Sequence, residues 1–195
     1  MSDPRSAKQP LRQQLLAWRR GLSPDVLHEA SRAIAGGIGG LPEVRAARVV
    51  ALYQALRNEI EMEPLWRELV LAGKQVLFPR IHPGTRQLAF ALVDDPAELE
   101  VGALGVRQPP ASRDVPLGSI DLIVVPALAF DAEGRRLGRG GGYYDATLAA
   151  HPAALRVGPC LEAALLDEVP AEVHDEAVDV VVTEARVLRP SRHRR

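Results

Sequence analysis

The sequence lacks several features that define specialised classes of protein. It has one cysteine, Cys160, in 195 residues, which excludes an internal disulfide framework and a multi-cysteine zinc site. Its 24 Lys and Arg residues nearly balance 25 Asp and Glu residues, so no global field would concentrate it on nucleic acid or on an anionic membrane. No apolar run approaches the roughly 20 residues of a membrane span, and charged or amide residues interrupt the short hydrophobic runs near the amino terminus, which predicts no secretion signal.

These absences favour a cytoplasmic protein that acts on small molecules and has neither nucleic-acid nor membrane partners. We expect a monomer, although the oligomeric state does not follow from the sequence. The composition allows a substantial core, because 47% of the residues are hydrophobic and 25% are charged. We therefore expect one domain over residues 1–195, with flexible ends at residues 1–7 and 189–195.

Lysine is also scarce. Only Lys8 and Lys74 are lysines among the 24 basic residues. A lysine ammonium is a compact point charge suited to a phosphate oxygen, whereas arginine is a planar fork, so the two are not always interchangeable. Lys74 follows Gly73 at a predicted helix-to-strand turn. Lys8 is therefore the better candidate for a phosphate contact.

Helical patterns and apolar runs alternate along the chain. Helices are predicted at residues 9–20, from Ser23-Pro24-Asp25 to the glycines at 36–40, and at residues 64–73. Strands are predicted at residues 48–54, 75–79, 88–93, 120–126, 155–160 and 178–183. Because these strands are apolar rather than polar on one face, we predict an α/β fold of three layers: an open, mostly parallel, Rossmann-like sheet with helices on both faces.

The most informative segment, residues 120–150, runs from an apolar strand through a glycine-rich loop into a predicted helix. The loop has four glycines in five positions: Gly138, Gly140, Gly141 and Gly142. Three arginines are expected to add positive charge beside them: Arg135, Arg136 and Arg139. Glycines let several backbone N–H groups approach one anion, and a helix that opens at Tyr143 would point its free N–H groups at the same place. The pattern predicts a phosphate site at the carboxyl edge of the sheet.

Neither common nucleotide motif explains this loop. No Gly-Lys-Ser or Gly-Lys-Thr ends it, and the dinucleotide fingerprint fails in spacing and position. A mobile surface loop with solvated arginines is the alternative. Tyr143 and Tyr144 could stack on a flat ligand or anchor the helix to the sheet. Asp145, in the first helical turn, could hold Mg²⁺ or only complement the helix dipole.

The string PALAFDAEGRRLGRGGGYYDATL closely resembles the signature of 5-formyltetrahydrofolate cyclo-ligases, also called methenyltetrahydrofolate synthetases. Members of that family carry Pro-x-Leu-x-Phe-Asp followed by Arg-Leu-Gly-x-Gly-x-Gly-Tyr-Tyr-Asp. Further matches run in the family's order along nearly the whole chain: Lys8 with Leu11 and Arg12, Glu59, FPRI at 78–81, and VPAEVHDEAVDVVVTE at 169–184. The resemblance implies a sheet similar to the sugar-phosphate isomerase and CoA-transferase-like fold.

The resemblance also implies a reaction, the ATP- and Mg²⁺-dependent closure of 5-formyltetrahydrofolate to 5,10-methenyltetrahydrofolate with release of ADP and phosphate. In the family's scheme the formyl oxygen attacks the γ-phosphate of ATP, and the neighbouring folate amine then closes on the activated carbon and expels phosphate. Such a reaction needs positioning and electrostatics rather than a protein nucleophile. The sequence offers no convincing Ser-His-Asp or Cys-His arrangement.

The site residues carried over from the family fall into three groups. The implied nucleotide contacts are Lys8, Arg12, Arg136, Leu137, Gly138, Arg139, Gly140, Gly141, Gly142, Tyr143 and Tyr144. The implied folate contacts are Gln54, Glu59, Arg139, Gly140, Gly141, Gly142 and Tyr143. The positions associated with Mg²⁺ are Asp145 and Asp175.

Four positions depart from the commoner family pattern. Gln108 stands where glutamate is frequent, Ala164 where glutamine is frequent, Gly141 where some members have lysine, and Ala146 where many bacterial members have arginine. These departures bear on substrate affinity more than on the class of reaction.

Two other functions stay open at the level of sequence. A nucleotide-binding paralogue without cyclo-ligase activity would keep the glycine loop and lose the folate contacts. A sugar-phosphate or acyl-CoA enzyme on a similar sheet would bind phosphate independently of ATP and would need a catalytic carboxylate beside the loop. Two reactive side chains receive no role: we interpret His174 as a surface or capping residue and Cys160 as a buried space-filler.

Overall fold

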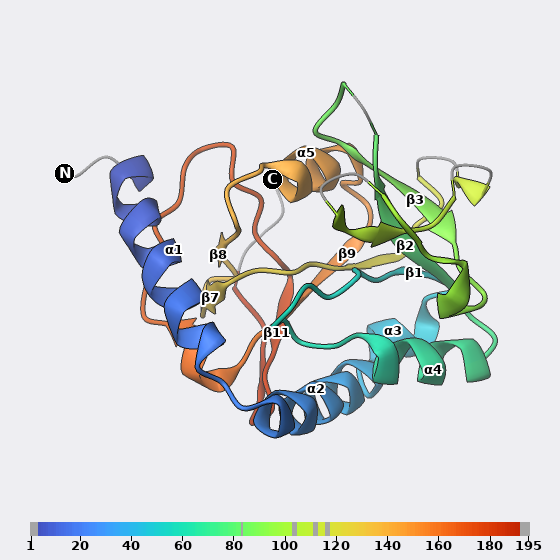
Figure 1. The fold of residues 1–195 in the computed structure, drawn as a ribbon, viewed down its shortest axis with the longest axis horizontal. Helices are drawn as coiled ribbons and strands as arrows, with labels where there is room; N and C mark the ends of the chain where they lie inside the picture. Colours follow the sequence, from blue (N-terminus) through green and yellow to red (C-terminus); the bar gives the residue numbers. More distant parts are fainter. Residues whose placement is uncertain (1–3, 83, 103–104, 111–112, 116–117, 192–195) are drawn as a thin grey trace.

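A seven-stranded sheet forms the centre of the fold (Figure 1). The computed structural model describes residues 4–82, 84–102, 105–110, 113–115 and 118–191. Across the sheet the strands are β12 (Val187–Leu188), β11 (Val180–Val182), β9 (Leu155–Pro159), β6 (Leu122–Val124), β1 (Val49–Ala51), β2 (Gln75–Ile81) and β3 (Leu88–Leu92). The five inner strands are mutually parallel, whereas β3 and β12 are antiparallel at the two edges. The predicted mostly parallel sheet is confirmed.

Helices lie on both sides of this sheet. They are α1 (Pro4–Arg20), α2 (Pro24–Gly39), α3 (Pro42–Ala46), α4 (Glu63–Leu71) and α5 (Tyr143–Ala150). In Figure 1, α2, α3 and α4 lie on one side of the sheet and α5 lies on the other, which confirms the three predicted layers. Within the described residues, none of these helices has the length and apolar character needed to cross a membrane.

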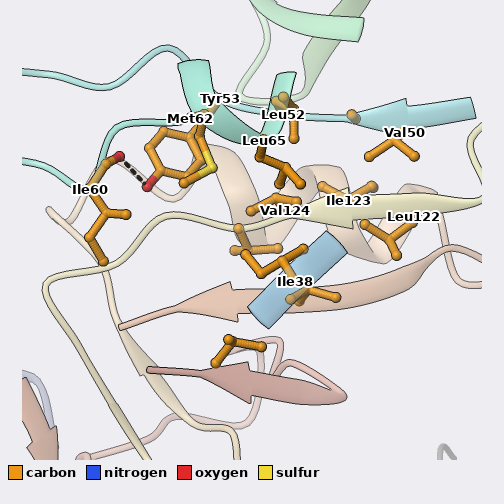
Figure 2. Close-up of a cluster of buried hydrophobic side chains, with 14 of the residues drawn as sticks. Ile38, Val50, Leu52, Tyr53, Ile60, Met62, Leu65, Leu122, Ile123 and Val124 are labelled. Carbon is orange, nitrogen blue, oxygen red and sulfur yellow. Dashed lines mark hydrogen bonds between the residues drawn. The ribbon is translucent and has the colours of Figure 1, made fainter. Parts of the chain in front are cut away.

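The larger core lies where α2 and α4 pack on the sheet (Figure 2). Ile38 of α2 and Leu65 of α4 are fully buried in one cluster with Val50 and Ile123 of the inner strands. Strand β1 is shorter than the predicted strand at 48–54. Beyond its end, the side chain of Tyr53 is buried in the core, where its hydroxyl donates to the carbonyl of Ile60 at 2.8 Å.

A smaller sheet joins α1 to the rest of the molecule. Its order is β10 (Leu165–Leu166), β7 (Ala129–Asp131) and β8 (Arg136–Leu137). A second buried cluster, with Leu15 and Leu137 among its members, lies between this sheet and α1. Buried Arg19, near the end of α1, donates to the carbonyls of Ala127 and Leu128 at 2.7 and 3.0 Å. This anchoring holds α1 beside the glycine-rich segment.

The remaining elements are short. They are β4 (Glu100–Val101), β5 (Arg107–Gln108) and the 3-10 turns η1 (Pro96–Glu98) and η4 (Glu162–Ala164). The sequence does not predict these elements, nor α3, β7, β8, β10 and β12, because elements of two to five residues carry too little periodicity to be recognised.

Candidate active site

One cavity of about 710 Å³ lies over the carboxyl ends of β1 and β6. Seven separate segments of the chain line it: the start of α1, the loop after β1, the β2–β3 hairpin, residues 106–108, the loop after β6, the glycine loop with α5, and the segment that precedes β11. The position agrees with the expectation that ligands of open α/β sheets bind beyond the carboxyl edge.

The glycine loop forms the floor between α1 and α5. Gly140 has a φ of +99° and Gly142 a φ of +72°, conformations that favour glycine, and α5 begins directly after Gly142 without a side-chain cap. Arg12 reaches over from α1, and its Nε donates to the carbonyl of Gly138 at 2.9 Å. A Cβ added to Gly140 would lie 3.5 Å from the guanidinium carbon of Arg12. The backbone of the loop and the guanidinium of Arg12 therefore face the same part of the cavity.

Lys8 also lines the cavity and is buried, with two carboxylates around its ammonium. Its Nζ donates to Glu172 Oε1 at 2.8 Å and to Asp175 Oδ2 at 2.6 Å. The same Asp175 oxygen accepts the backbone N–H of Glu172 at 2.6 Å. A helix at one end of the chain and a loop near the other end are thus joined by charge-assisted hydrogen bonds.

A second ion pair joins Arg136 to Asp145. The guanidinium Nη2 donates to Asp145 Oδ1 at 2.5 Å, and its Nε donates to the carbonyl of Glu176 at 3.2 Å. Asp145 Oδ1 also accepts the backbone N–H of Glu176 at 3.2 Å. The first turn of α5 is therefore fixed to the segment that carries Asp175.

The third ion pair lies at the end of the cavity near β1. Glu59, which is 8% exposed, accepts Arg139 Nε at 2.8 Å on Oε1 and the backbone N–H of Leu56 at 3.0 Å on Oε2. Asn58 adopts a left-handed φ of +64°, a conformation that asparagine tolerates better than most residues, and so turns the chain to present Glu59. Burial raises the pKa of the Tyr144 hydroxyl, and the neighbouring charge of Glu59 raises it further.

The residues named from the sequence converge on this cavity, with the exceptions of Leu137 and Arg135. Leu137 does not line it: because neighbouring strand residues point to opposite faces, Arg136 faces the cavity while Leu137 enters the smaller core. The expected contribution of Arg135 to the phosphate site is wrong. Its Nε donates to buried Asp131 at 2.6 Å, a contact that stabilises the β7–β8 turn outside the cavity.

Residues 4–184 match the family model described as the 5-formyltetrahydrofolate cyclo-ligase family. The chain belongs to this family. It is 34% identical over 174 residues to the 5-formyltetrahydrofolate cyclo-ligase of Escherichia coli strain K12, covering 87% of this chain and 96% of that one. It is 36% identical over 190 residues to the cyclo-ligase of Mycolicibacterium smegmatis, covering 94% and 96%. The solved structure of 5,10-methenyltetrahydrofolate synthetase from Aquifex aeolicus matches with a TM-score of 0.83 and 34% identity over 96% of this chain and 95% of that one.

The departures from the commoner cyclo-ligase pattern lie mostly in the cavity wall. Gln108, Gly141 and Ala146 line it, whereas Ala164 is buried and does not. Gln108 Oε1 accepts the backbone N–H of Ile81 at 3.1 Å, a contact that a glutamate oxygen could also make. Glutamine in place of the commoner glutamate at position 108 therefore keeps the hydrogen bond to the backbone of Ile81.

Part of the cavity of this cyclo-ligase family member is not predicted from the sequence. Glu172 contacts Lys8, and its spacing of three residues before Asp175 is the one signal that could have found it. The wall formed by the β2–β3 hairpin also escapes detection. It includes Pro79, Ile81, Arg86 and Leu88. Apolar strand residues that face a cavity follow the same alternation as those that face a core, so no pattern separates them.

The oxygen donors of the cavity suit a hard divalent cation. Within the described residues, donor atoms of Glu172, His174 and Asp175 lie within 4.8 Å of one another. Asp145 lines the same cavity from α5. Mg²⁺ takes oxygen ligands and is usually bound by one or two carboxylates together with substrate phosphates. The carboxylates fit such an ion, although each now faces a cationic side chain.

Proposed function

We propose that this protein catalyses the ATP-dependent cyclisation of 5-formyltetrahydrofolate to 5,10-methenyltetrahydrofolate, with release of ADP and phosphate. The observation that carries the proposal is that one cavity of about 710 Å³ is lined by Lys8, the glycine loop and Glu59. Phosphate-binding groups and a buried carboxylate therefore share one space, as a reaction between a nucleotide and a second substrate requires. The names of the relatives in Escherichia coli and Mycolicibacterium smegmatis support the same reaction.

The chemical problem is that a formamide oxygen is a poor leaving group. In the proposed first step the formyl oxygen attacks the γ-phosphorus of ATP, an O–P bond forms, and the bond to the β-phosphate oxygen breaks to release ADP. In the second step the neighbouring folate amine attacks the activated formyl carbon and loses its proton to solvent, and the C–O bond breaks to expel phosphate. No protein atom forms a covalent bond in either step.

The nucleotide phosphates are proposed to lie against the glycine loop. The N–H groups at the start of α5 have no partners within the helix and can donate to phosphate oxygens. Arg12 contributes a guanidinium that Gly138 holds in place at 2.9 Å. Such donors act most strongly on the charge that develops during phosphoryl transfer, because they need no reorganisation when it appears.

The folate is proposed to lie toward Glu59. A buried carboxylate with one oxygen on Arg139 and the other on a backbone N–H is held rigidly, and it can still accept hydrogen bonds from the donor edge of a pterin. Gln54 lines the same end and Tyr143 partly covers the loop, where its ring can pack on a flat substrate. This placement directs the formyl group toward the glycine loop.

Asp145 and Asp175 are the residues proposed to hold Mg²⁺ in the working enzyme. When bound, the ion would neutralise charge on the nucleotide phosphates. Lys8 and Arg136, which now pair with these carboxylates, remain beside the same phosphates and limit the repulsion between ATP and the acidic wall.

The direct test mixes the purified protein with 5-formyltetrahydrofolate, ATP and Mg²⁺ and follows the near-ultraviolet absorbance of the methenyl product. We expect absorbance to rise only when all three are present, with one ADP formed for each product molecule. A rise in ADP without product would indicate a nucleotide hydrolase, and no change in either would contradict the proposed function.

A further inference from the structure

The surroundings of Lys8 differ from those expected of a residue that only binds phosphate. Its side chain is 5% exposed, and its ammonium donates to Glu172 at 2.8 Å and to Asp175 at 2.6 Å. One positive charge thus faces two negative charges, and the trio of Lys8, Glu172 and Asp175 carries an excess of negative charge. All three residues line the cavity. In this arrangement the trio repels a triphosphate, although it contains the lysine expected to attract one.

The Arg136–Asp145 pair of the cavity is tied to the backbone through both of its partners. Arg136 donates to the carbonyl of Glu176, and Asp145 accepts the N–H of the same residue, so that pair is fixed from both sides. Among the contacts described for Lys8, both acceptors are side-chain carboxylates. A carboxylate can exchange an ammonium for another cation without any change in the backbone. Lys8 is therefore easier to release from its carboxylates than Arg136 is.

We infer that Lys8 serves as an internal counter-ion, which a divalent cation displaces from Glu172 and Asp175 so that its ammonium becomes available to the phosphates of ATP. The inference rests on the proposed function and adds Glu172 to the residues that act on the metal. With the cation bound, the two carboxylates are neutralised and the ammonium keeps its full charge for the nucleotide. Metal and nucleotide then bind cooperatively, because each removes an obstacle to the other.

The sharpest consequence is a pair of effects with opposite signs. In Lys8→Met the carboxylates lose their counter-ion, so we expect Mn²⁺ alone to bind about tenfold more tightly than to the unaltered protein. ATP alone, with chelator present, should bind about tenfold more weakly. Electron paramagnetic resonance measures free Mn²⁺ without any turnover, and titration calorimetry measures ATP. A lysine that serves only as a phosphate ligand would weaken ATP and leave Mn²⁺ unchanged, and that result would overturn the inference.

A second variant protects the test against loss of folding in Lys8→Met. In Glu172→Gln the trio becomes neutral overall, so metal-free ATP should bind about tenfold more tightly and Mn²⁺ more weakly. Weaker binding of metal-free ATP to Glu172→Gln would also overturn the inference. The double variant Lys8→Met with Glu172→Gln should lose the gain in Mn²⁺ affinity. Circular dichroism at each step confirms that the variants are folded.

The other lysine provides the matched control. Lys74→Met removes an ammonium that donates to the carbonyls of Arg45 and Ala47, remote from the cavity, so Mn²⁺ and ATP affinities should not change. Failure of the inference is distinguishable from failure of the function. If the unaltered protein forms the methenyl product while Lys8→Met binds Mn²⁺ with unaltered affinity, the function stands and the counter-ion role fails.

Discussion

The two lysines of the chain lie in regions that are built in different ways. Lys74 lies in the turn between α4 and β2, and its ammonium donates to the carbonyls of Arg45 and Ala47 at 2.8 and 2.6 Å. Those carbonyls belong to the carboxyl end of α3, where a positive charge complements the helix dipole. Lys8 donates instead to the side chains of Glu172 and Asp175, which belong to a distant part of the chain.

The difference separates scaffold from site. Around Lys74 the acceptors are backbone carbonyls at the end of α3, and the ammonium closes a turn remote from the cavity. Around Lys8 the acceptors are carboxylates that line a cavity and can accept a different cation. The Lys74 ammonium therefore stabilises the fold, whereas the Lys8 ammonium is placed to take part in binding.

Replacing each lysine by alanine gives the largest expected contrast. Lys8→Ala should lower kcat/KM for ATP by about 10²–10³-fold, because one preorganised positive charge is lost beside the transferred phosphoryl group. Lys74→Ala should leave kcat/KM unchanged and lower the melting temperature, because the end of α3 loses its cation. Steady-state kinetics and thermal unfolding of both variants check the pair. Unchanged KM and turnover in Lys8→Ala would remove Lys8 from the mechanism.

Two glutamates in ion pairs provide the second contrast. Glu59→Gln removes the negative charge that faces Arg139, so we expect KM for 5-formyltetrahydrofolate to rise on the order of tenfold. KM for ATP should change little, because Glu59 lies toward the proposed folate end. Glu43 also pairs with an arginine, Arg189, at the protein surface, and Glu43→Gln should alter neither KM. A larger effect on KM for ATP than on KM for 5-formyltetrahydrofolate would show that Glu59 acts at the nucleotide end of the cavity and not at the folate end.

Two glycines with the same backbone conformation provide the third contrast. Gly73 has a φ of +73° and Gly142 a φ of +72°. Alanine at either position should lower the free energy of unfolding by about 1–2 kcal/mol, because a Cβ disfavours the left-handed region. Only Gly142→Ala should also lower kcat, by roughly tenfold, since it displaces the start of α5. Denaturant unfolding and kinetics of both variants test this, and equal kinetic effects would contradict it.

Much of the central sheet could be predicted from the sequence, because strands 120–126 and 178–183 are apolar runs too short for helices. Their register and the two antiparallel edges could not be predicted, since a run of apolar residues contains no information about its neighbour's direction. The small sheet was missed for a related reason. Strands such as β8, with two residues, show no period.

The glycine loop of the candidate site could be predicted because a cluster of glycines directly before a helix is recognisable in the sequence. The structure gives two of these glycines a positive φ. The ion pairs could not, because Lys8 and Asp175 are separated by 167 positions and meet only when α1 docks on the small sheet. Arg135 shows that closeness in sequence can also mislead. Its sequence position next to the loop predicted a phosphate contact, yet the buried carboxylate of Asp131 competes for it and stabilises a turn.

The two ends of α5 also differ, and at the end remote from the glycine loop we expect a substitution to change stability but not activity. Gly142, at the first end, faces the cavity, whereas His151, at the other end, is buried edge-on against Phe90 at a centroid distance of 6.0 Å. Neither ring nitrogen of His151 has a hydrogen-bond partner among the described residues. Burial lowers the pKa of this imidazole below its ordinary value of 6.5, because the charged form is poorly solvated there.

Linkage fixes the sign of the result. Below pH 6.5 the unfolded chain binds a proton at His151 that the folded protein does not bind until a lower pH, so this group favours unfolding increasingly as pH falls. His151→Leu removes the proton site and the unpartnered nitrogens. We therefore expect the variant to lose less unfolding free energy than the unaltered protein between pH 7.5 and pH 5.5 in urea titrations, with KM for ATP unchanged. An equal loss in both proteins would show that folded His151 binds its proton at the same pH as the unfolded chain does, and would contradict the lowered pKa.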